Sequence, residues 1–180
     1  RIEAYASISG TVLIDDTNPL TAGQILLLGI TNTDGYDTIS SIALGTGGTY
    51  THTNAPLGDY ITLAKPDTLS FSNYLPTYWG ELTNSFLWEE ADTIQLDSTI
   101  LDLNIKLVGE PAEKPAGQGV IGGILEEEVP DGGRIEAKKR VASAGVSVRR
   151  AKKQGKAEED ELELVAYVYT NSEGEFEFKD

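Results

Sequence analysis

The chain of 180 residues contains no cysteine, no methionine and one histidine. The lack of cysteine excludes disulfides, thiolate metal sites and a cysteine nucleophile. Because methionine is absent, we expect the chain that begins at Arg1 to be a processed protein or a fragment. No stretch approaches the ~20 apolar residues of a membrane-spanning helix, and no charged-then-apolar leader is present. We therefore expect no membrane insertion, and a signal peptide that has been removed if one existed.

The scarcity of histidine also argues against catalysis. His52 alternates with Tyr50, which places both rings on one face of a strand. A structural imidazole is the simpler interpretation, because no nucleophile motif accompanies it and zinc needs more His or Cys ligands. The acidic Glu89, Glu90 and Asp92 point to different faces of a short helix and predict a solvated surface. We predict no enzymatic activity and no cofactor.

Negative charge dominates the first part of the chain. The net charge is −15, and residues 1–110 hold 3 Lys and Arg against 14 Asp and Glu, whereas residues 111–180 hold 11 against 15. An acidic surface repels phosphate backbones and anionic lipids. We expect no nucleic-acid partner, and solubility is the simplest use of the excess charge.

The apolar residues recur with the period of strands. Short runs rich in β-branched and aromatic residues end at turn-forming groups such as residues 15–19 and Asp34-Gly35. This spacing predicts an all-β fold of immunoglobulin-like or prealbumin-like antiparallel β-sandwich modules. The predicted strands cover residues 4–14, 24–30, 36–44, 49–54, 56–63 and 100–108, and the one predicted helix, with Thr83 or Asn84 as its cap, covers residues 82–91.

The same order of parts occurs twice, which favours a surface array over an enzyme. A strand with a central glycine, an Ala-Gly strand and a turn before an aromatic strand occur as Ile8–Val12, Ala22–Leu27 and Gly47–His52, then as Val120–Ile124, Ala144–Val148 and Asn171–Phe178. Residues 109–118 between them have the composition of a linker. We predict a β-sandwich module over residues 1–108, this linker, and a partial second module over residues 119–180.

The first module resembles a known family. It carries the elements Ile8-Ser9-Gly10-Thr11-Val12, Ala22-Gly23-Gln24-Ile25, Gly47-Gly48-Thr49-Tyr50-Thr51-His52 and Pro56-Leu57-Gly58-Asp59-Tyr60, followed by Tyr74–Gly80, Trp88–Ala91 and Asp102–Ile105. These are similar to the carboxypeptidase-regulatory-like or transthyretin-like β-sandwich modules of large secreted Bacteroidota surface proteins, many of them exported by the type IX pathway. The resemblance implies an extracellular or cell-surface protein whose modules act as stalks, spacers or adhesive units. His52 stands where the family has an aromatic residue.

An aromatic group is the best candidate for binding. It consists of Tyr74, Tyr78, Trp79, Phe86 and Trp88. Aromatic faces stack on sugar rings or fill a partner's pocket, so a glycan is a candidate ligand. The alternative is that these side chains close one end of the sandwich core.

An oxygen-rich turn is a weak candidate for calcium. Asp15, Asp16 and Asn18 offer oxygen ligands, but calcium takes six or more and the sequence shows only this cluster. Elsewhere, residues 149–164 pass from basic to acidic and predict a hairpin whose arms carry opposite charge.

The second module ends before the closing strands of the first have been repeated. Exposed strand edges pair readily with other chains, so the partners we expect are neighbouring modules of the same polypeptide or a protein that donates a strand. We therefore interpret the chain as a non-enzymatic structural or adhesive module of a larger secreted protein. The alternative is a carbohydrate-binding accessory module of a secreted polysaccharide-degrading enzyme.

Overall fold

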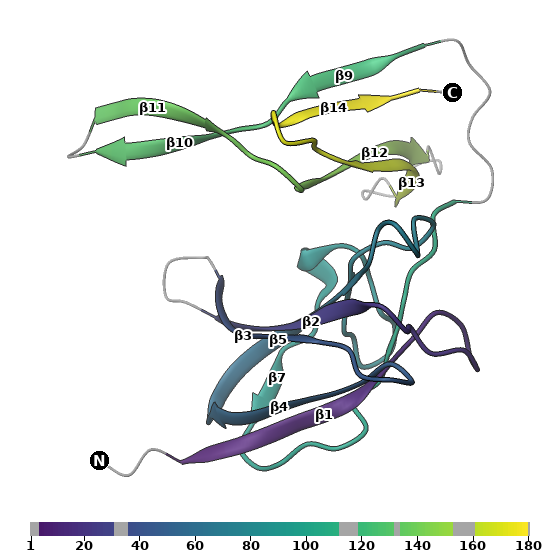
Figure 1. Ribbon diagram of the computed structural model, residues 1–180, viewed down its shortest axis with the longest axis vertical. Coiled ribbons are helices and arrows are strands. Elements are labelled where there is room, and N and C mark those ends of the chain that lie inside the picture. Colours follow the sequence, from purple (N-terminus) through teal and green to yellow (C-terminus); the bar gives the residue numbers. More distant parts are fainter. Residues whose placement is uncertain (1–3, 31–35, 112–118, 132–133, 153–160, 180) are drawn as a thin grey trace. The chain divides into compact units, whose positions relative to one another are not determined.

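A computed structural model describes residues 4–30, 36–111, 119–131, 134–152 and 161–179 (Figure 1). The contacts divide the chain into two compact units, Arg1–Gly109 (unit 1) and Glu110–Asp180 (unit 2). In both units the described backbone is built from strand pairs, antiparallel except for one parallel pair in unit 1, so the fold is all-β as predicted. Among the described residues, no helix has the length and apolar character to span a membrane. Residues 112–118 of the predicted linker lie outside the described part.

Unit 1 is a sandwich of two sheets. One sheet has the order β4-β1-β8 and the other β3-β2-β5-β6, with β7 pairing β5. The strands are β1 (Tyr5–Leu13), β2 (Gly23–Ile30), β3 (Tyr36–Ala43), β4 (Thr49–Pro56), β5 (Gly58–Pro66), β6 (Thr77–Tyr78), β7 (Ile94–Leu96) and β8 (Ile105–Lys106). The predicted strands before residue 66 are confirmed to within a few residues at each end.

Alternating side chains of both sheets fill the core of unit 1. Ile8 and Val12 of β1 are fully buried against Ile25 and Leu27 of β2, as the period of two along a strand requires. The central strand β5 is buried on its other face as well, where Ile61 packs in a second, smaller cluster. Burial of an aliphatic side chain stabilises a fold by about 1.5–3 kcal/mol, so these clusters are a main source of stability for a chain that has no cysteine to form a disulfide.

Unit 1 is closed by a segment that runs back beside β1. The carbonyl of Leu103 lies over Gly10, where a Cβ would collide with it, and accepts a hydrogen bond from Tyr50 Oη at 2.6 Å. Beyond this crossing the chain pairs with β1 in parallel. The predicted alternation is real over residues 103–107, and Ile105–Lys106 forms a ladder with β1. Asp102, with a φ of 61°, interrupts the strand after Ile100, which still bridges Ile8.

Unit 2 consists of three strand pairs in its described residues. β9 pairs with β14, β10 with β11 and β12 with β13, all antiparallel. Their bounds are β9 (Ile121–Ile124), β10 (Glu126–Asp131), β11 (Arg134–Arg140), β12 (Gly145–Lys152), β13 (Glu161–Tyr169) and β14 (Glu175–Phe178).

The first-strand ladder of unit 1 recurs in unit 2. In unit 1, Gly10 of β1 lies opposite Tyr50 of β4. In unit 2, Gly123 of β9 lies opposite Phe176 of β14, again antiparallel. The repeat seen in the sequence is therefore a repeat of strand pairing, with β9 equivalent to β1 and β14 to β4. Gly10 corresponds to Gly123, however, and not to Gly122, the central glycine of the sequence alignment.

The turn before the aromatic strand is also the same in both units. Gly48 has a φ of 72° and accepts a hydrogen bond from the N–H of Val12 at 2.9 Å. Gly174 has a φ of 71° and accepts one from Leu125 at 2.8 Å. Positive φ favours glycine. A Cβ at Gly48 would press on the carbonyl oxygen of Val12, and a Cβ at Gly174 would press on that of Leu125. The two turns are equivalent residue by residue.

The equivalence of β2 and β12 differs by one residue from the alignment of their Ala-Gly pairs. Leu44 donates to the carbonyl of Gly23 at 3.1 Å, and its counterpart Thr170 donates to that of Ala144 at 2.9 Å. Gly23 thus corresponds to Ala144, not to Gly145. A slip of one residue moves every side chain of a strand to the other face of its sheet. The structural register keeps the apolar residues of β12 toward the core, whereas the register of the sequence alignment would turn them away.

A β-bulge confirms this register. The pairing of β2 with β3 shifts between Leu27 and Leu28, and that of β12 with β13 shifts between Val148 and Arg149. Val148 is the counterpart of Leu27, so the bulge falls at the same step in both units. The units differ in the connection that precedes β2 and β12. In unit 1 this connection is a short turn closed by a bridge between Leu13 and Pro19. In unit 2 the equivalent residues, Glu126 and Arg140, are the first pair of the longer hairpin β10–β11.

The predicted helix over residues 82–91 is wrong. Only Trp88–Glu90 forms a single 3-10 turn. Tyr78 and Ser85 exchange backbone hydrogen bonds at 2.6 and 3.2 Å, and the Asn84 side chain accepts one from Gly80. These bonds use the groups that a helix would need, as is common for Asn and Ser, whose side chains compete with helical pairing.

Substitution of Gly10 by alanine tests the closure of unit 1. The new Cβ would meet the backbone of Leu103, which cannot move without breaking its bond to Tyr50. We expect Gly10→Ala to lower the free energy of unfolding by about 1–3 kcal/mol, measured by denaturant titration. Gly58→Ala is the matched control, since the nearest atoms to its Cβ lie at 3.9 Å. Equal stabilities for the two variants would contradict the crossing.

Candidate functional site

The predicted aromatic group is divided between the core and the surface. Tyr74 and Trp79 are half-buried and pack against the main core of unit 1, and Tyr78 packs against the smaller cluster around Ile61. Burial raises the pKa of the Tyr78 hydroxyl, as expected for a phenol removed from water. These three side chains contribute to packing, which was the alternative interpretation of the group.

Trp88 is the most exposed member of this group. Its exposed fraction is 51%, and its ring meets that of Tyr36 edge-on with centroids 5.9 Å apart. Phe86 is half-buried. No sequence pattern pointed to Tyr36, because this residue lies far from Trp88 along the chain and only the fold brings the two rings together. Trp88 and Tyr36 form the aromatic pair of unit 1.

The oxygen-rich turn is held by its own hydrogen bonds. Asp15 Oδ1 accepts from the N–H groups of Thr17 and Asn18, both at 2.8 Å, and Oδ2 accepts from Asn18 Nδ2 at 2.8 Å. The bond from the Asn18 side chain, followed by those from the two N–H groups, holds the pKa of Asp15 well below its usual range. Asp16 bonds Lys106 Nζ at 2.8 Å. The Asp15 carboxylate thus fixes the turn, and the interpretation of this turn as only a weak calcium candidate stays a prediction.

Other carboxylates near the aromatic pair act in the same way. Glu90 accepts a hydrogen bond from Ser85 Oγ at 2.6 Å, and Asp92 accepts one from the N–H of Glu81 at 2.8 Å. Within the described ranges, no group of three or more His, Cys, Asp or Glu side chains is placed to hold a metal ion.

His52 is enclosed in the core of unit 1. Its Nδ1 lies 2.9 Å from Ser40 Oγ, and its ring meets that of Tyr50 edge-on at 5.8 Å between centroids. Nε2 is buried and has no partner among the described residues. Burial lowers the pKa of the imidazole to about 4. A neutral, packed histidine fits the structural role predicted for it, and Phe178 fills the equivalent position in unit 2.

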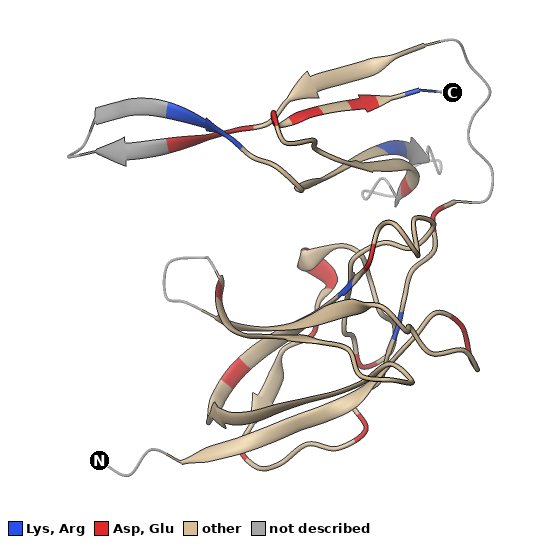
Figure 2. Cartoon of the chain, in the orientation of Figure 1, with Lys and Arg blue, Asp and Glu red and all other residues tan. Residues whose placement is uncertain are grey.

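Charge in unit 2 is arranged on facing strands. Figure 2 shows the acidic segment of β10 beside the basic segment of β11. Glu126 lies 3.5 Å from Lys138 and 3.3 Å from Arg140, and Arg150 of β12 lies 2.7 Å from Glu163 of β13. The hairpin of opposite charge predicted over residues 149–164 is seen in the pair of Arg150 and Glu163. Residues 153–160 of that prediction lie outside the described part. Exposed pairs add only about 0.2–1 kcal/mol each.

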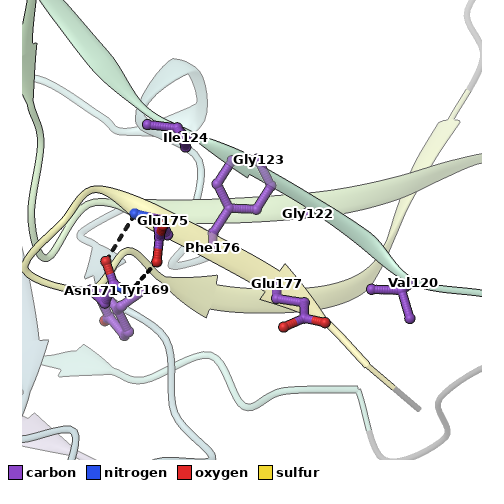
Figure 3. A pocket seen from close by; sticks show the side chains of 9 residues that line it. All are labelled: Val120, Gly122, Gly123, Ile124, Tyr169, Asn171, Glu175, Phe176 and Glu177. Carbon is purple, nitrogen blue, oxygen red and sulfur yellow. Dashed lines mark hydrogen bonds between the residues drawn. The ribbon is translucent and has the colours of Figure 1, made fainter.

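An open pocket of about 450 Å³ lies over β9 and β14 (Figure 3). Its wall includes Gly122, Gly123 and Ile124 on one strand and Phe176 on the other. At its rim, the side chain of Asn171 makes two hydrogen bonds to Glu175, of 2.9 and 3.1 Å. The pocket is therefore a gap over the two-stranded sheet of unit 2, and its lining also includes Tyr169 and Glu177.

The titration of His52 gives a test of its burial. A pKa of about 4 in the fold and an ordinary value near 6.5 in the unfolded chain mean that the unfolded state binds the extra proton between these values. The stabilisation is complete above about pH 6.5. We expect the free energy of unfolding of unit 1 to fall by about 2–3 kcal/mol as the pH drops from 6.5 to 4.

The matched variant is His52→Phe, which carries the residue of unit 2. It should lose this component of the pH dependence while keeping a cooperative transition. An imidazole that titrates near pH 6.5 by NMR in the folded chain would contradict the enclosure of His52.

Comparison with known proteins gives only remote likenesses. No protein-family model matches the chain, and no curated protein matches it. Similar solved structures include the TIE protein of Bacillus anthracis (13% identity, TM-score 0.36, 98% of this chain and 26% of that one) and a streptococcal ancillary pilin (12%, 0.39, 97% and 49%). A third is the major pilin subunit of Bacillus cereus (16%, 0.36, 58% and 30%). The chain spans between about a quarter and a half of these proteins, and TM-scores below 0.5 establish no shared family.

Proposed function

We propose that this chain is a non-enzymatic structural or adhesive segment, a stalk or spacer, of a larger protein secreted to the cell surface. The observation that carries the proposal is the repetition of one module down to its hydrogen bonds, with the same glycine turn at Gly48 and Gly174. Tandem copies lengthen a protein without adding a new site. The expected partners are neighbouring modules of the same polypeptide.

The pairing of the first and last strands of unit 1 suits a segment that carries load. β1 and β8 run in parallel, and the N–H of Ser9 and the N–H of Ile100 bond across the same pair of segments at 3.0 and 2.9 Å. Thr11 adds a bond from its N–H to Asn104 Oδ1 at 2.9 Å. A pull on the two ends of the unit loads these bonds together in shear, because parallel neighbours are drawn past each other.

The polar side chains support a structural role rather than chemistry. Asp15 fixes a turn, Glu90 and Asp92 bond neighbouring groups, and His52 is held neutral in the core. Each of these groups was a conceivable acid, base or ligand from its residue type. In the fold each one satisfies a polar group of the chain itself.

A second function is favoured by one observation, the aromatic pair of Trp88 and Tyr36. An exposed tryptophan held edge-on by a tyrosine presents a flat apolar face, the feature on which sugar rings stack. This is the basis for the alternative that the chain is a carbohydrate-binding accessory module of a secreted polysaccharide-degrading enzyme. The family resemblance to Bacteroidota modules is compatible with both functions and stays part of the proposal.

Single-molecule pulling tests the structural function. Handles attached at Ala4 and Gly109 shear the pairing of β1 with its parallel neighbour, whereas handles at Ala4 and Leu57 peel β1 from β4, because Tyr5 lies opposite Pro56. We expect a higher unfolding force in the shear geometry. Asn104→Ala should lower that force and cost about 1 kcal/mol of stability, since it removes one bond to Thr11. Asn73→Ala is the control, and equal forces in the two geometries would contradict the proposal.

Binding to immobilised polysaccharides tests the alternative. Trp88→Ala should abolish retention with little change in the melting temperature, because the residue is 51% exposed and belongs to neither core cluster. Leu82→Ala, at a side chain 95% exposed, is the control and should bind normally. Trp79→Ala should lower the stability by about 2–3 kcal/mol through lost packing. If no polysaccharide retains the unmodified chain, the accessory-module function is excluded.

A further inference from the structure

The outer face of the larger sheet of unit 1 carries two tyrosines. Tyr78 of β6 packs there on the cluster around Ile61, away from the main core. Tyr36, at the start of β3, lies opposite Ile30 of β2. Because side chains alternate along a strand, Ile30 is on the same face as Leu28, which is a member of the outer cluster. Tyr36 and Tyr78 are therefore on one face of the sheet.

The 3-10 turn Trp88–Glu90 places a second ring against Tyr36. The planes of the two rings stand at 72° to each other, and their centroids are 5.9 Å apart. Trp88 is 51% exposed and Tyr36 is 38% exposed. Two ring planes at such an angle form an open corner, in which one group can contact both rings. The face of an aromatic ring is negative, so it attracts a cation.

A carboxylate without a partner lies beside this corner. Glu89 follows Trp88 in the turn, is exposed, and makes no hydrogen bond or ion pair within the described ranges. Burial raises the pKa of the Tyr78 hydroxyl, and the charges of Tyr36 and Glu89 add to the rise. Tyr36 and Glu89 both act on this one hydroxyl, and Tyr36 contacts Trp88. The carboxylate and the rings are thus neighbours.

The described part of unit 1 has no cation of its own to fill the corner. Its basic residues are two lysines, and Lys106 is paired with Asp16 at 2.8 Å. Lys65 lies opposite Gln24, at the end of β2 away from Ile30. Gln24 and Ile30 are about 20 Å apart along the strand, so this ammonium group is remote from the corner. With 3 Lys and Arg against 14 Asp and Glu, residues 1–110 favour a cationic partner.

We infer that the corner formed by Trp88, Tyr36 and Glu89 binds the guanidinium group of an arginine side chain on a partner protein. A guanidinium is flat and always charged, so it stacks on an aromatic face while its N–H fork bonds a carboxylate. A neutral sugar can stack on the same rings, but it gains nothing from the negative charge of the unit. Arginine and tryptophan also concentrate binding energy in protein interfaces. The inference rests on the adhesive role proposed above and names the chemistry of the partner.

Two small probes test the requirement for charge. Nα-acetyl-argininamide carries the guanidinium, and Nα-acetyl-citrullinamide has the same shape with a neutral urea. The chain contains two tryptophans, so NMR resolves two indole N–H signals, and that of Trp79, which packs on the core, is an internal control. We expect argininamide to shift the Trp88 signal and citrullinamide to bind about fivefold more weakly. Added sodium chloride should weaken the binding of argininamide alone.

Variants of the full chain test each wall of the corner. Glu89→Gln and Tyr36→Leu should each weaken argininamide binding by about two- to fivefold. Tyr36→Phe keeps the ring and should bind normally. The control for net charge is Asp102→Asn, at an exposed residue between Ile100 and Leu103, both of which bond β1 of the other sheet. Asparagine tolerates the positive φ of this position.

Equal affinity for the two probes, or unchanged argininamide binding by Glu89→Gln, would overturn the inference. So would the absence of any shift at Trp88. A larger response of Trp88 to methyl glucoside than to argininamide would assign the rings to a sugar instead. The pulling experiment does not involve Trp88, and the polysaccharide assay measures a different ligand. The failure of either proposed function is therefore distinguishable from the failure of this inference.

Discussion

The passage of Leu103 over Gly10 is the contact on which unit 1 depends. It holds the last segment of the unit beside the first strand, with the Tyr50 hydroxyl fixing the carbonyl from the other side. Beyond it, Ile105 and Leu107 are buried in the core. A side chain of any size at position 10 would lift this segment and expose the inner face of β1. Glycine is therefore required here for contact between two backbones, and not for a turn.

The strands could be predicted from the sequence because their apolar pattern is local. The register of the repeat could not, because the Ala-Gly pairs at Gly23 and Gly145 match in letters but not in hydrogen bonding. Side chains along a strand alternate between its two faces, and only the pairing with a neighbouring strand determines which of the two sets faces the core. The hairpin β10–β11 was missed for a related reason. Its residues around Glu126 and Lys138 are charged, so they lack the apolar alternation that predicts a strand.

The candidate site was less predictable than the fold. Residue type could not distinguish Trp79 from Trp88, but in the fold Trp79 packs on the core and Trp88 is exposed. The partner of Trp88, Tyr36, comes from a strand edge distant in the sequence. For Asp15 the residue type was informative in a different sense, since short acidic side chains cap turns as readily as they bind cations.

The shared register of β2 and β12 has a consequence for how the chain matures. One polypeptide carries two edges, at Ile25 and at Val146, whose core-facing pattern β5 matches. During synthesis the N-terminal residues fold first, so β5 meets β2 before β12 has left the ribosome. Exchange of strands between similar modules is a characteristic way for repeat proteins to misfold. Folding of the N-terminal unit first, during synthesis, lowers the opportunity for such an exchange between two repeats of the same register.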